Sequence, residues 1–406
     1  MDVRLEVERW SKLTGMPPLL RALGAHEGLT RLVGGAVRDG LLGLDGTDID
    51  LATRLRPEEV VRRLQDAGIK AVPTGIDHGT ITAVSEGQVV EVTTLRRDVS
   101  TDGRRATVAF TDDWKEDAAR RDFTINALSA DPVSGQVFDY FNGLADLGTR
   151  TVRFIGEPLL RIAEDHLRIL RFFRFQARFG TGAPDSDALE ACTARANDLM
   201  ALSRERIADE LLKLLSLPDP ASTVRLMIER GILKPVLPEI EMQGAARLDQ
   251  LGQVEQGAGM RPQALLRLAA LLPPDPEVGT RVAARLRLSN AQQKRLASAL
   301  TTPAGSPREM AFRLGTAFAM DRIALAGDRS LQERIAALDG LATWTVPKLP
   351  ISGGALIQRG LSEGPAVART LRAIEDAWIK AGFPEGAAFD HIVEDVLAAG
   401  AAERRS

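Results

Sequence analysis

The period of the hydrophobic pattern changes near residue 155, and this change limits the chain to a mixed domain followed by a helical one. Up to about residue 150, short strand-like runs alternate with amphipathic helical segments such as PEEVVRRLQDAG, which Pro57 starts and Gly68 ends. The strand-like runs are TRLVGGAV, DIDLAT, GTITAV, VVEVTTL and QVFDYF. After residue 155, apolar residues recur at helical spacing, as in LLRIAEDHLRILRFFRFQARF. We therefore expect an α/β or α+β N-terminal domain and an all-α remainder, with helix connections at LLPPDPEVG, TTPAGSPRE and TVPKLPISGG.

Composition excludes several classes of protein. The 406 residues are 44% hydrophobic and 26% charged, which is typical of a globular chain with more than one core. The net charge of −3 gives no general attraction for nucleic acid, so a polyanionic partner would have to bind local basic surface. A single cysteine, Cys192, excludes a disulfide within the chain, and we find neither a charged-then-apolar leader nor an apolar run of about 20 residues. These features predict a cytoplasmic protein without a membrane segment.

Paired carboxylates in the stretch LVGGAVRDGLLGLDGTDIDLAT suggest a metal site. In a strand, residues two apart point to the same face, so Asp48 and Asp50 would project together. Carboxylate oxygens suit Mg²⁺, whose remaining positions are commonly filled by substrate phosphates. Glu91, in VVEVTTL, is placed to add a third carboxylate on a neighbouring strand. Such a set can hold two metal ions that clamp an in-line displacement at phosphorus.

The glycines before this pair suggest a phosphate-binding turn. Gly34 and Gly35 would let backbone amides approach a triphosphate at the start of a helix, and Arg38 would add a cation. Neither a Gly-x-Gly-x-x-Gly stretch nor a Gly-Lys-Ser/Thr loop is present, so other common phosphate-binding motifs do not apply. An ordinary turn would explain the two glycines alone, and a solvated strand end would explain the paired carboxylates alone. The occurrence of both in this order favours a nucleotide site.

The chain resembles class II CCA-adding enzymes, the tRNA nucleotidyltransferases related to bacterial poly(A) polymerases, over about residues 30 to 220. The matching stretches occur in the family's order: LVGGAVRD and DIDLAT, HGTITAV, VEVTTLRRDVSTDGRRATVAF, EDAARRDFTINAL, DLGTRTVRFIG, EDHLRILRFFRF and RERIADELLKLL. The resemblance implies an α+β polymerase-β-like nucleotidyltransferase head over 1–150 and a helical neck with a base-reading helix over 151–220. A helical, RNA-binding body and tail would occupy 221–406.

The same resemblance implies roles for further residues. Asp48 and Asp50 match the metal-binding carboxylates, and Gly35 and Arg38 match triphosphate contacts. Arg121, in RRDFTINAL, matches a further nucleotide contact.

Two other features of the matching region keep alternatives open. Asp122 and Asn126 either hydrogen-bond ribose or support the helix that carries Arg121. The polar segment 98–114 matches the flexible loop that the family needs for adding the final A, although an ordinary mobile surface loop is also compatible with its polarity. The run RERIADELLKLL favours a scaffold for the neck over a catalytic role.

A row of arginines marks the predicted base-reading helix. Residues three or four apart in EDHLRILRFFRFQARF share one helix face, and this face carries Asp165, Arg168, Arg171, Arg174 and Arg178. One acid among four arginines leaves an unbalanced cationic stripe, which favours a polyanion over an ordinary solvated face. We expect Arg171 and Arg174 to contact the nucleotide.

Asp165 and Arg168 have the chemistry to distinguish bases. Cytosine and adenine each present an amino donor beside a ring-nitrogen acceptor, so an aspartate can accept while an arginine donates. Uracil and guanine place a carbonyl where the amino group should be, opposite the carboxylate. The pair is therefore predicted to select C and A without a nucleic-acid template. A helix salt bridge between Asp165 and Arg168 is compatible with this role and would preorganise the pair.

Together these residues predict an enzyme that adds C, C and A to tRNA 3' ends from CTP and ATP, with Mg²⁺ as cofactor; no protein partner is indicated. The alternative enzyme is a poly(A) polymerase of the same superfamily, which would share the head motifs. A strongly basic C-terminal extension would favour this alternative, whereas this chain ends AAGAAERRS and has a pI of about 6.0. A non-catalytic RNA-binding protein is the other alternative, against which the paired carboxylates argue.

Overall fold

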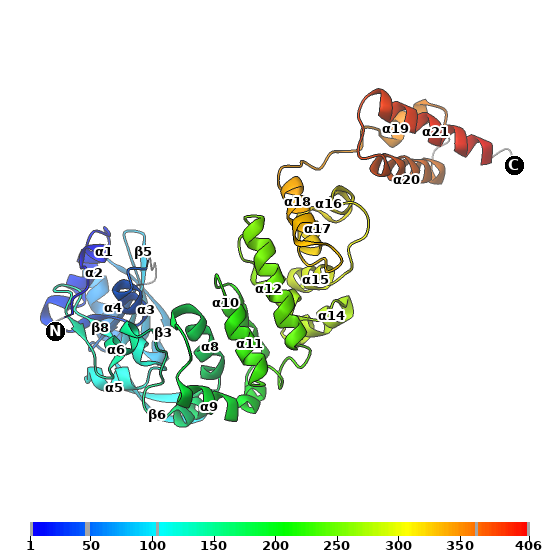
Figure 1. Cartoon of the computed structure of the whole chain (residues 1–406). Helices are drawn as coiled ribbons and strands as arrows, with labels where there is room; N and C mark the ends of the chain where they lie inside the picture. Colours follow the sequence, from blue (N-terminus) through cyan, green and yellow to red (C-terminus); the bar gives the residue numbers. More distant parts are fainter. Residues whose placement is uncertain (1–2, 45–48, 103–104, 362–363, 404–406) are drawn as a thin grey trace. The chain divides into compact units, whose positions relative to one another are not determined.

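The computed structural model describes residues 3–44, 49–102, 105–361 and 364–403 (Figure 1). The chain divides into two compact units, Met1–Pro238 and Glu239–Ser406. The finer division into head, neck, body and tail at residues 150 and 220 stays a prediction.

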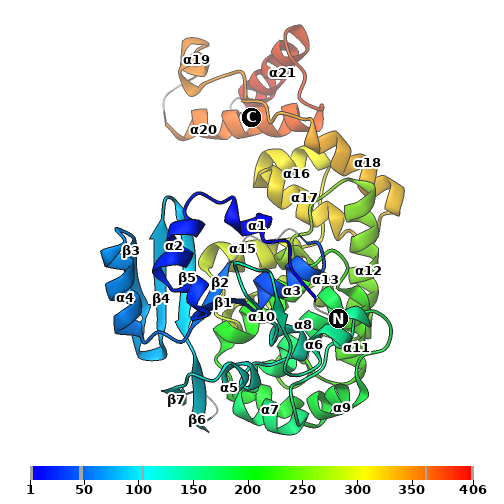
Figure 2. The same ribbon diagram turned by 90° about the vertical axis from the view of Figure 1, so that its left-hand side faces the viewer.

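A seven-stranded mixed sheet forms the centre of the N-terminal unit, in the order β3-β4-β5-β2-β1-β8-β9. Figure 2 shows its strands β1 to β5. Its strands are β1 Thr30–Val33, β2 Asp50–Thr53, β3 Lys70–Gly75, β4 Thr80–Ser85, β5 Gln88–Thr94, β8 Ser129–Ala130 and β9 Val137–Phe138. β2 and β5 pair in parallel, whereas the other neighbours pair antiparallel. In β4 buried residues alternate with partly exposed ones, because alternate side chains point to opposite faces of a sheet.

Short helices alternate with these strands, which confirms the predicted α+β class. They are α1 Glu8–Ser11, α2 Met16–Ala22, α3 Gly35–Leu41, α4 Pro57–Asp66, α5 Trp114–Ala119 and α6 Gly143–Gly148, with 3₁₀ turns η1 Ala25–Glu27, η2 Ile76–His78 and η3 Thr124–Asn126. α2 and α4 contact β4, and α4 begins at Pro57 as the sequence predicts. Its end is followed by Gly68, whose φ of +70° suits glycine.

The helices that follow the sheet are α7 Pro158–Glu164, α8 Arg168–Phe179, α9 Ser186–Ala194, α10 Arg204–Leu215 and α11 Ala221–Glu229, with η4 Ala196–Ala201. α8 packs against both α10 and α11. Buried phenylalanines join α8 to the head. The ring centroid of Phe123, just before η3, lies 5.0 Å from those of Phe154 and Phe175. Burial of such large rings stabilises the position of α8 relative to the RRDFTINAL stretch.

The prediction that EDHLRILRFFRF forms one continuous helix is wrong. α7 ends at Glu164 and α8 begins at Arg168, and Asp165 between them is extended, with φ −152° and ψ 106°. Its Oδ1 accepts a hydrogen bond from the backbone N–H of Leu167 at 3.1 Å. An aspartate that bonds to nearby backbone in this way competes with helical hydrogen bonding, so it interrupts the helix. Asp165 therefore does not share a helix face with the arginines.

The polar segment 98–114 is largely a β-ribbon and not an irregular loop. β6 Arg96–Asp102 and β7 Arg105–Phe110 form a separate two-stranded antiparallel sheet, in which Arg96 pairs with Phe110. Residues 103 and 104 lie outside the described ranges. At the base of the ribbon, a Cβ added at Gly79 would lie 2.7 Å from the ring of Phe110, so only glycine allows this close approach.

The C-terminal unit is helical throughout its described residues, as predicted. Its helices are α12 Met242–Gly257, α13 Ala264–Leu271, α14 Pro276–Arg285, α15 Asn290–Ala299, α16 Pro307–Leu314, α17 Thr316–Ala324, α18 Leu331–Ala342, α19 Gly353–Gln358, α20 Pro365–Lys380 and α21 Ala387–Glu403. Each predicted Pro- and Gly-rich stretch contains the connection between two helices, and its last residues begin the following helix, α14, α16 or α19. Within the described ranges, the chain has no helix with the length and apolar character needed to cross a membrane.

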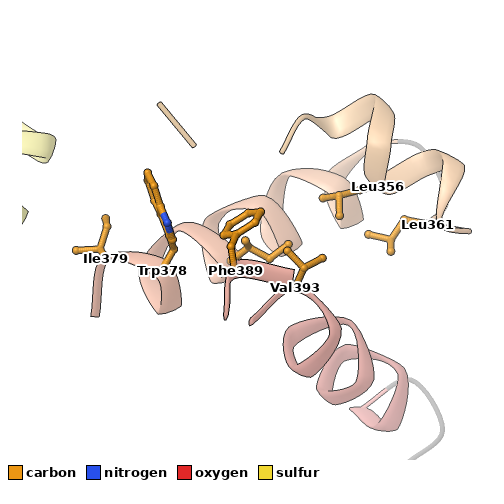
Figure 3. Close-up of a cluster of buried hydrophobic side chains, with 7 residues drawn as sticks. Leu356, Leu361, Trp378, Ile379, Phe389 and Val393 are labelled. Atoms are coloured by element: carbon orange, nitrogen blue, oxygen red, sulfur yellow. The ribbon is translucent and has the colours of Figure 1, made fainter. Parts of the chain in front are cut away.

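Helices α19 to α21 enclose a hydrophobic cluster of their own. Trp378 and Ile379 of α20 pack with Leu356 of α19 and with Phe389 and Val393 of α21 (Figure 3). The indole N–H of Trp378 donates to the carbonyl of Pro384 at 2.8 Å, so this buried polar group is satisfied.

Candidate active site

The Gly-Gly turn follows β1 and begins α3. Gly34 adopts φ +62° and ψ −123°, a conformation that residues with a Cβ rarely adopt. A Cβ added there would also lie 3.1 Å from Nη1 of Arg121. Because β1 pairs with β2 with Leu32 opposite Leu51, the turn lies beside the first residue of β2, Asp50. The structure thus brings together the turn, Arg121 and one of the predicted carboxylates.

Two carboxylates stand side by side on the sheet. Asp50 of β2 is the register partner of Glu91 on the parallel strand β5, so both side chains lie on one face. Asp50 is partly buried and Glu91 is exposed. Asp48 lies outside the described residues, and within the described part no three His, Cys, Asp or Glu side chains gather as a metal site. The hard oxygen donors of Asp50 and Glu91 fit a divalent ion such as Mg²⁺.

Arg38 is buried beneath the turn, with 5% of its surface exposed. Its Nε donates to Oδ1 of Asp39 at 2.8 Å, and its Nη1 donates to Oδ1 of Asn126. The guanidinium carbon lies 4.1 Å from the ring centroid of Phe179 on α8. These contacts join α3 to α8. A direct contact between Arg38 and a triphosphate stays a prediction.

Asp122 and Asn126 continue this network. Asp122 is 8% exposed, and its Oδ1 accepts from Nδ2 of Asn126 at 2.9 Å. Its Oδ2 accepts from Nε of Arg171 at 2.8 Å, and Nη2 of the same guanidinium lies 2.6 Å from Oδ2 in an ion pair. Burial alone would raise the pKa of Asp122, but the Arg171 cation and the hydrogen bonds outweigh burial, so the pKa lies below its ordinary value. The geometry supports a structural role for both residues, and a ribose contact stays a prediction.

The arginines of α8 are balanced by acids from other elements. Nε of Arg174 donates to Oε2 of Glu210 on α10 at 2.6 Å, and Nη1 of Arg171 lies 3.5 Å from Oε1 of the same carboxylate. The expectation of an unbalanced cationic stripe is therefore wrong, because Asp122 and Glu210 are far away in sequence and close in space. Direct nucleotide contacts by Arg171 and Arg174 stay predictions.

Glu210 was missed by the sequence reasoning, although the sequence carries a signal for it. It is 4% exposed and lies on the apolar face of α10, between Ile207 and Leu214. A glutamate at helical spacing among buried residues needs a cationic partner, because an isolated buried charge is strongly destabilising.

The two predicted base-reading residues lie at the junction of α7 and α8, where they bond to different partners. Nη1 of Arg168 donates to the carbonyl of Arg161 at 2.8 Å and pairs with Glu164, while Nη2 donates to the carbonyl of Arg120 at 3.0 Å. The Asp165 carboxylate instead accepts from Arg206. These contacts stand in place of the helix salt bridge between Asp165 and Arg168 that would be compatible with base reading, and base reading by the two residues stays a prediction.

A further acid, Asp117 of α5, connects Arg121 to the ribbon. Oδ2 of Asp117 lies 3.3 Å from Nη2 of Arg121, and Oδ1 accepts from the backbone N–H of Arg96 at 3.3 Å. Burial opposes the charge of Asp117, but Arg120 and Arg121 hold its pKa below the ordinary value.

Comparisons with known proteins agree with this arrangement. The family model described as the poly A polymerase head domain matches residues 30–153, and one described as the probable RNA- and SrmB-binding site of polymerase A matches 183–243. The mitochondrial CCA tRNA nucleotidyltransferase 1 of Mus musculus is 35% identical over 389 residues, which are 91% of this chain and 87% of the mouse protein. The CCA-adding enzyme of Streptococcus gordonii is 40% identical over 240 residues, covering 59% of this chain and 58% of the other. The crystal structure of the Bacillus stearothermophilus CCA-adding enzyme in complex with CTP matches with a TM-score of 0.72 and 26% identity, covering 96% of this chain and all of that chain.

Proposed function

This chain belongs to the family of CCA-adding tRNA nucleotidyltransferases, and from this premise we propose how its own residues add C, C and A to the 3' end of tRNA. The reaction uses CTP and ATP, and the attacking group is the RNA 3'-hydroxyl, which displaces pyrophosphate from the nucleotide α-phosphate. The observation that carries the assignment of residues is the position of Asp50 and Glu91 on one face of the sheet, beside the Gly34 turn and Arg121.

The family implies a divalent metal ion, and we propose Mg²⁺ held by Asp48 and Asp50, with Glu91 as a further ligand. When bound, this ion lowers the pKa of the attacking hydroxyl and neutralises charge on the departing pyrophosphate. Carboxylates are the protein ligands that suit this chemistry. We further propose a cytoplasmic location. Because the mouse relative is a mitochondrial protein, cell fractionation is the test that separates the two locations.

The triphosphate would lie against the Gly34–Gly35 turn, where backbone N–H groups at the start of α3 and the Arg121 guanidinium offer donors and positive charge. The N–H of Gly34 itself donates to the carbonyl of Leu128 at 3.4 Å. Arg38 and Arg171 would act chiefly by supporting the site and less by direct contact with the nucleotide, because both bond to the Asp122–Asn126 network that fixes α8 against the head. Fixing α8 matters because Arg168 begins this helix and Asp165 lies just before it, and a small misplacement at a reacting centre lowers rate strongly.

Base selection would come from Asp165 and Arg168. Both are close to the start of α8, and the Asp165 carboxylate retains acceptor capacity on each oxygen, because an ionised carboxylate has about four lone-pair sites. It would accept from the amino group of C or A and meet the carbonyl of U or G unfavourably. A site that reads a donor in this way rejects the analogue that lacks it more strongly than an apolar pocket could.

Incubation of tRNA lacking its CCA end with labelled CTP, ATP or both tests this function. We expect addition of C and C from CTP alone, a final A when ATP is also present, and no product from the Asp50→Asn variant. A long A tail from ATP alone would indicate a poly(A) polymerase. Absence of any product from the wild-type protein would contradict catalysis.

A further inference from the structure

The carboxylate of Asp165 is held by a residue of a third helix. Its Oδ2 accepts a hydrogen bond from Nη2 of Arg206, on α10, at 2.7 Å, and its Oδ1 accepts from the N–H of Leu167 at 3.1 Å. The side chains are 31% and 38% exposed, so the pair is open to solvent and to a ligand. Since each oxygen uses one acceptor position in these contacts, each keeps another for an incoming group.

Helix formation does not explain an arginine at position 206. Arg206 lies in the first turn of α10, whose N-cap is Ser203. A cation in the first turn is opposed by the helix dipole. A glutamate or glutamine three residues after the capping serine would instead complete a capping box, as it does at Ser289 and Gln292 of α15. The arginine is therefore better explained by its contact with Asp165.

Arg168 does not take this place in the structure. Its guanidinium is engaged by Glu164 and by the carbonyls of Arg161 and Arg120. Among the described side chains, Arg206 is thus the partner that orients the Asp165 carboxylate.

We propose that Arg206 is a positioning residue for base selection. It fixes the rotation of the Asp165 carboxylate so that the remaining lone pairs face the amino group of an incoming C or A. This inference rests on the proposed role of Asp165 in reading the base. Without Arg206 the carboxylate turns about its side-chain bonds, the amino group loses a fixed acceptor, and the carbonyl of U or G is no longer opposed by fixed negative charge.

The variant Arg206→Gln separates this role from a structural one. It removes the cation and places a glutamine where it can complete the capping box, so α10 should keep its stability. We expect the kcat/KM preference for CTP over UTP, and for ATP over GTP, to fall about tenfold, chiefly through a raised KM for the correct nucleotides. Arg206→Lys should restore part of the preference. The control Lys213→Gln removes an exposed cation of the same helix, paired with Asp209, and should leave the preference unchanged.

A double-mutant cycle distinguishes the possible failures. If Arg206 acts through Asp165, Arg206→Gln should reduce selection no further in an Asp165→Ala background. Equal loss of selection in both backgrounds would refute action through Asp165, and an equal fall in kcat for all four nucleotides with a lowered melting temperature would indicate a structural role only. If Asp165→Ala relaxes selection and Arg206→Gln does not, base reading stands and the positioning role is refuted. If Asp165→Ala keeps the full preference for C and A, both proposals fail.

Discussion

The ion pair between Asp122 and Arg171 joins the head to α8, and its removal should destabilise the N-terminal unit strongly. Arg171→Met keeps most of the aliphatic length and leaves the carboxylate of Asp122 buried without its cation. Breaking a buried pair by removing one partner costs about 3 to 5 kcal/mol. For a unit of this size each kcal/mol corresponds to about 2 to 4 °C, so the melting temperature should fall by about 6 to 20 °C at neutral pH.

The size of this loss should depend on pH in a definite direction. In the wild-type protein the pKa of Asp122 lies below its ordinary value, so the pair stabilises the fold above about pH 4, the unfolded pKa, and this contribution is lost as pH falls through the folded pKa. Without Arg171, burial becomes the dominant influence and raises the pKa of Asp122, so the variant loses stability as pH rises. The difference between wild type and variant should therefore grow from about pH 4 towards neutrality.

Thermal melts at several pH values, followed by circular dichroism, measure this difference. Arg62→Met is the matched control, because Arg62 is 61% exposed and pairs on the surface of α4 with Asp66 at 2.9 Å and with Glu59 at 2.7 Å, and an exposed pair contributes little to stability. A loss in Arg171→Met no larger than in the control, or a loss independent of pH, would refute the account of a buried, charged Asp122.

Three further changes test other parts of the site. Asp48→Ala or Asp50→Ala should abolish addition of both C and A while leaving tRNA binding nearly intact in a filter-binding assay; more than a few per cent of wild-type incorporation by both variants would contradict the metal assignment. Shortening the β6–β7 ribbon should spare CC addition and lose the terminal A, which product sizing on a sequencing gel would detect. Equal loss of C and A would show that the ribbon has only a structural role. Gly34→Ala should cost at least about 1 kcal/mol in stability and raise KM for CTP, because its φ of +62° disfavours a Cβ and Arg121 lies 3.1 Å from that position; an unchanged KM would show that the turn does not approach the nucleotide.

Local patterns were enough to predict much of the fold. The change of hydrophobic period separated the α+β part from the helical part, and Pro57 marked the start of α4. The sequence could predict that Asp50 and Glu91 lie on neighbouring strands, since both are in strand-like runs. Their parallel pairing could not be predicted, because it depends on which strands meet across the sheet.

The errors have two physical causes, one local and one from partners distant in sequence. The Asp165 break in the predicted helix comes from a side chain bonding to nearby backbone, and this local alternative outweighs the helical spacing of the apolar residues. The charge balance of α8 depends on Glu210, which is 36 residues from Arg174 in sequence, and spacing within one helix carries no information on such a partner. The same holds for Arg206, 41 residues from Asp165.

Competition among the four nucleoside triphosphates in the Asp165→Ala variant tests most directly the claim that protein side chains select the bases. We expect incorporation of CTP and ATP to fall by about one to two powers of ten, while use of UTP and GTP rises relative to them, because the variant lacks both the acceptor for the amino groups and the repulsion of the carbonyls. An Asp165→Ala enzyme that keeps the full wild-type preference for C and A would contradict the claim.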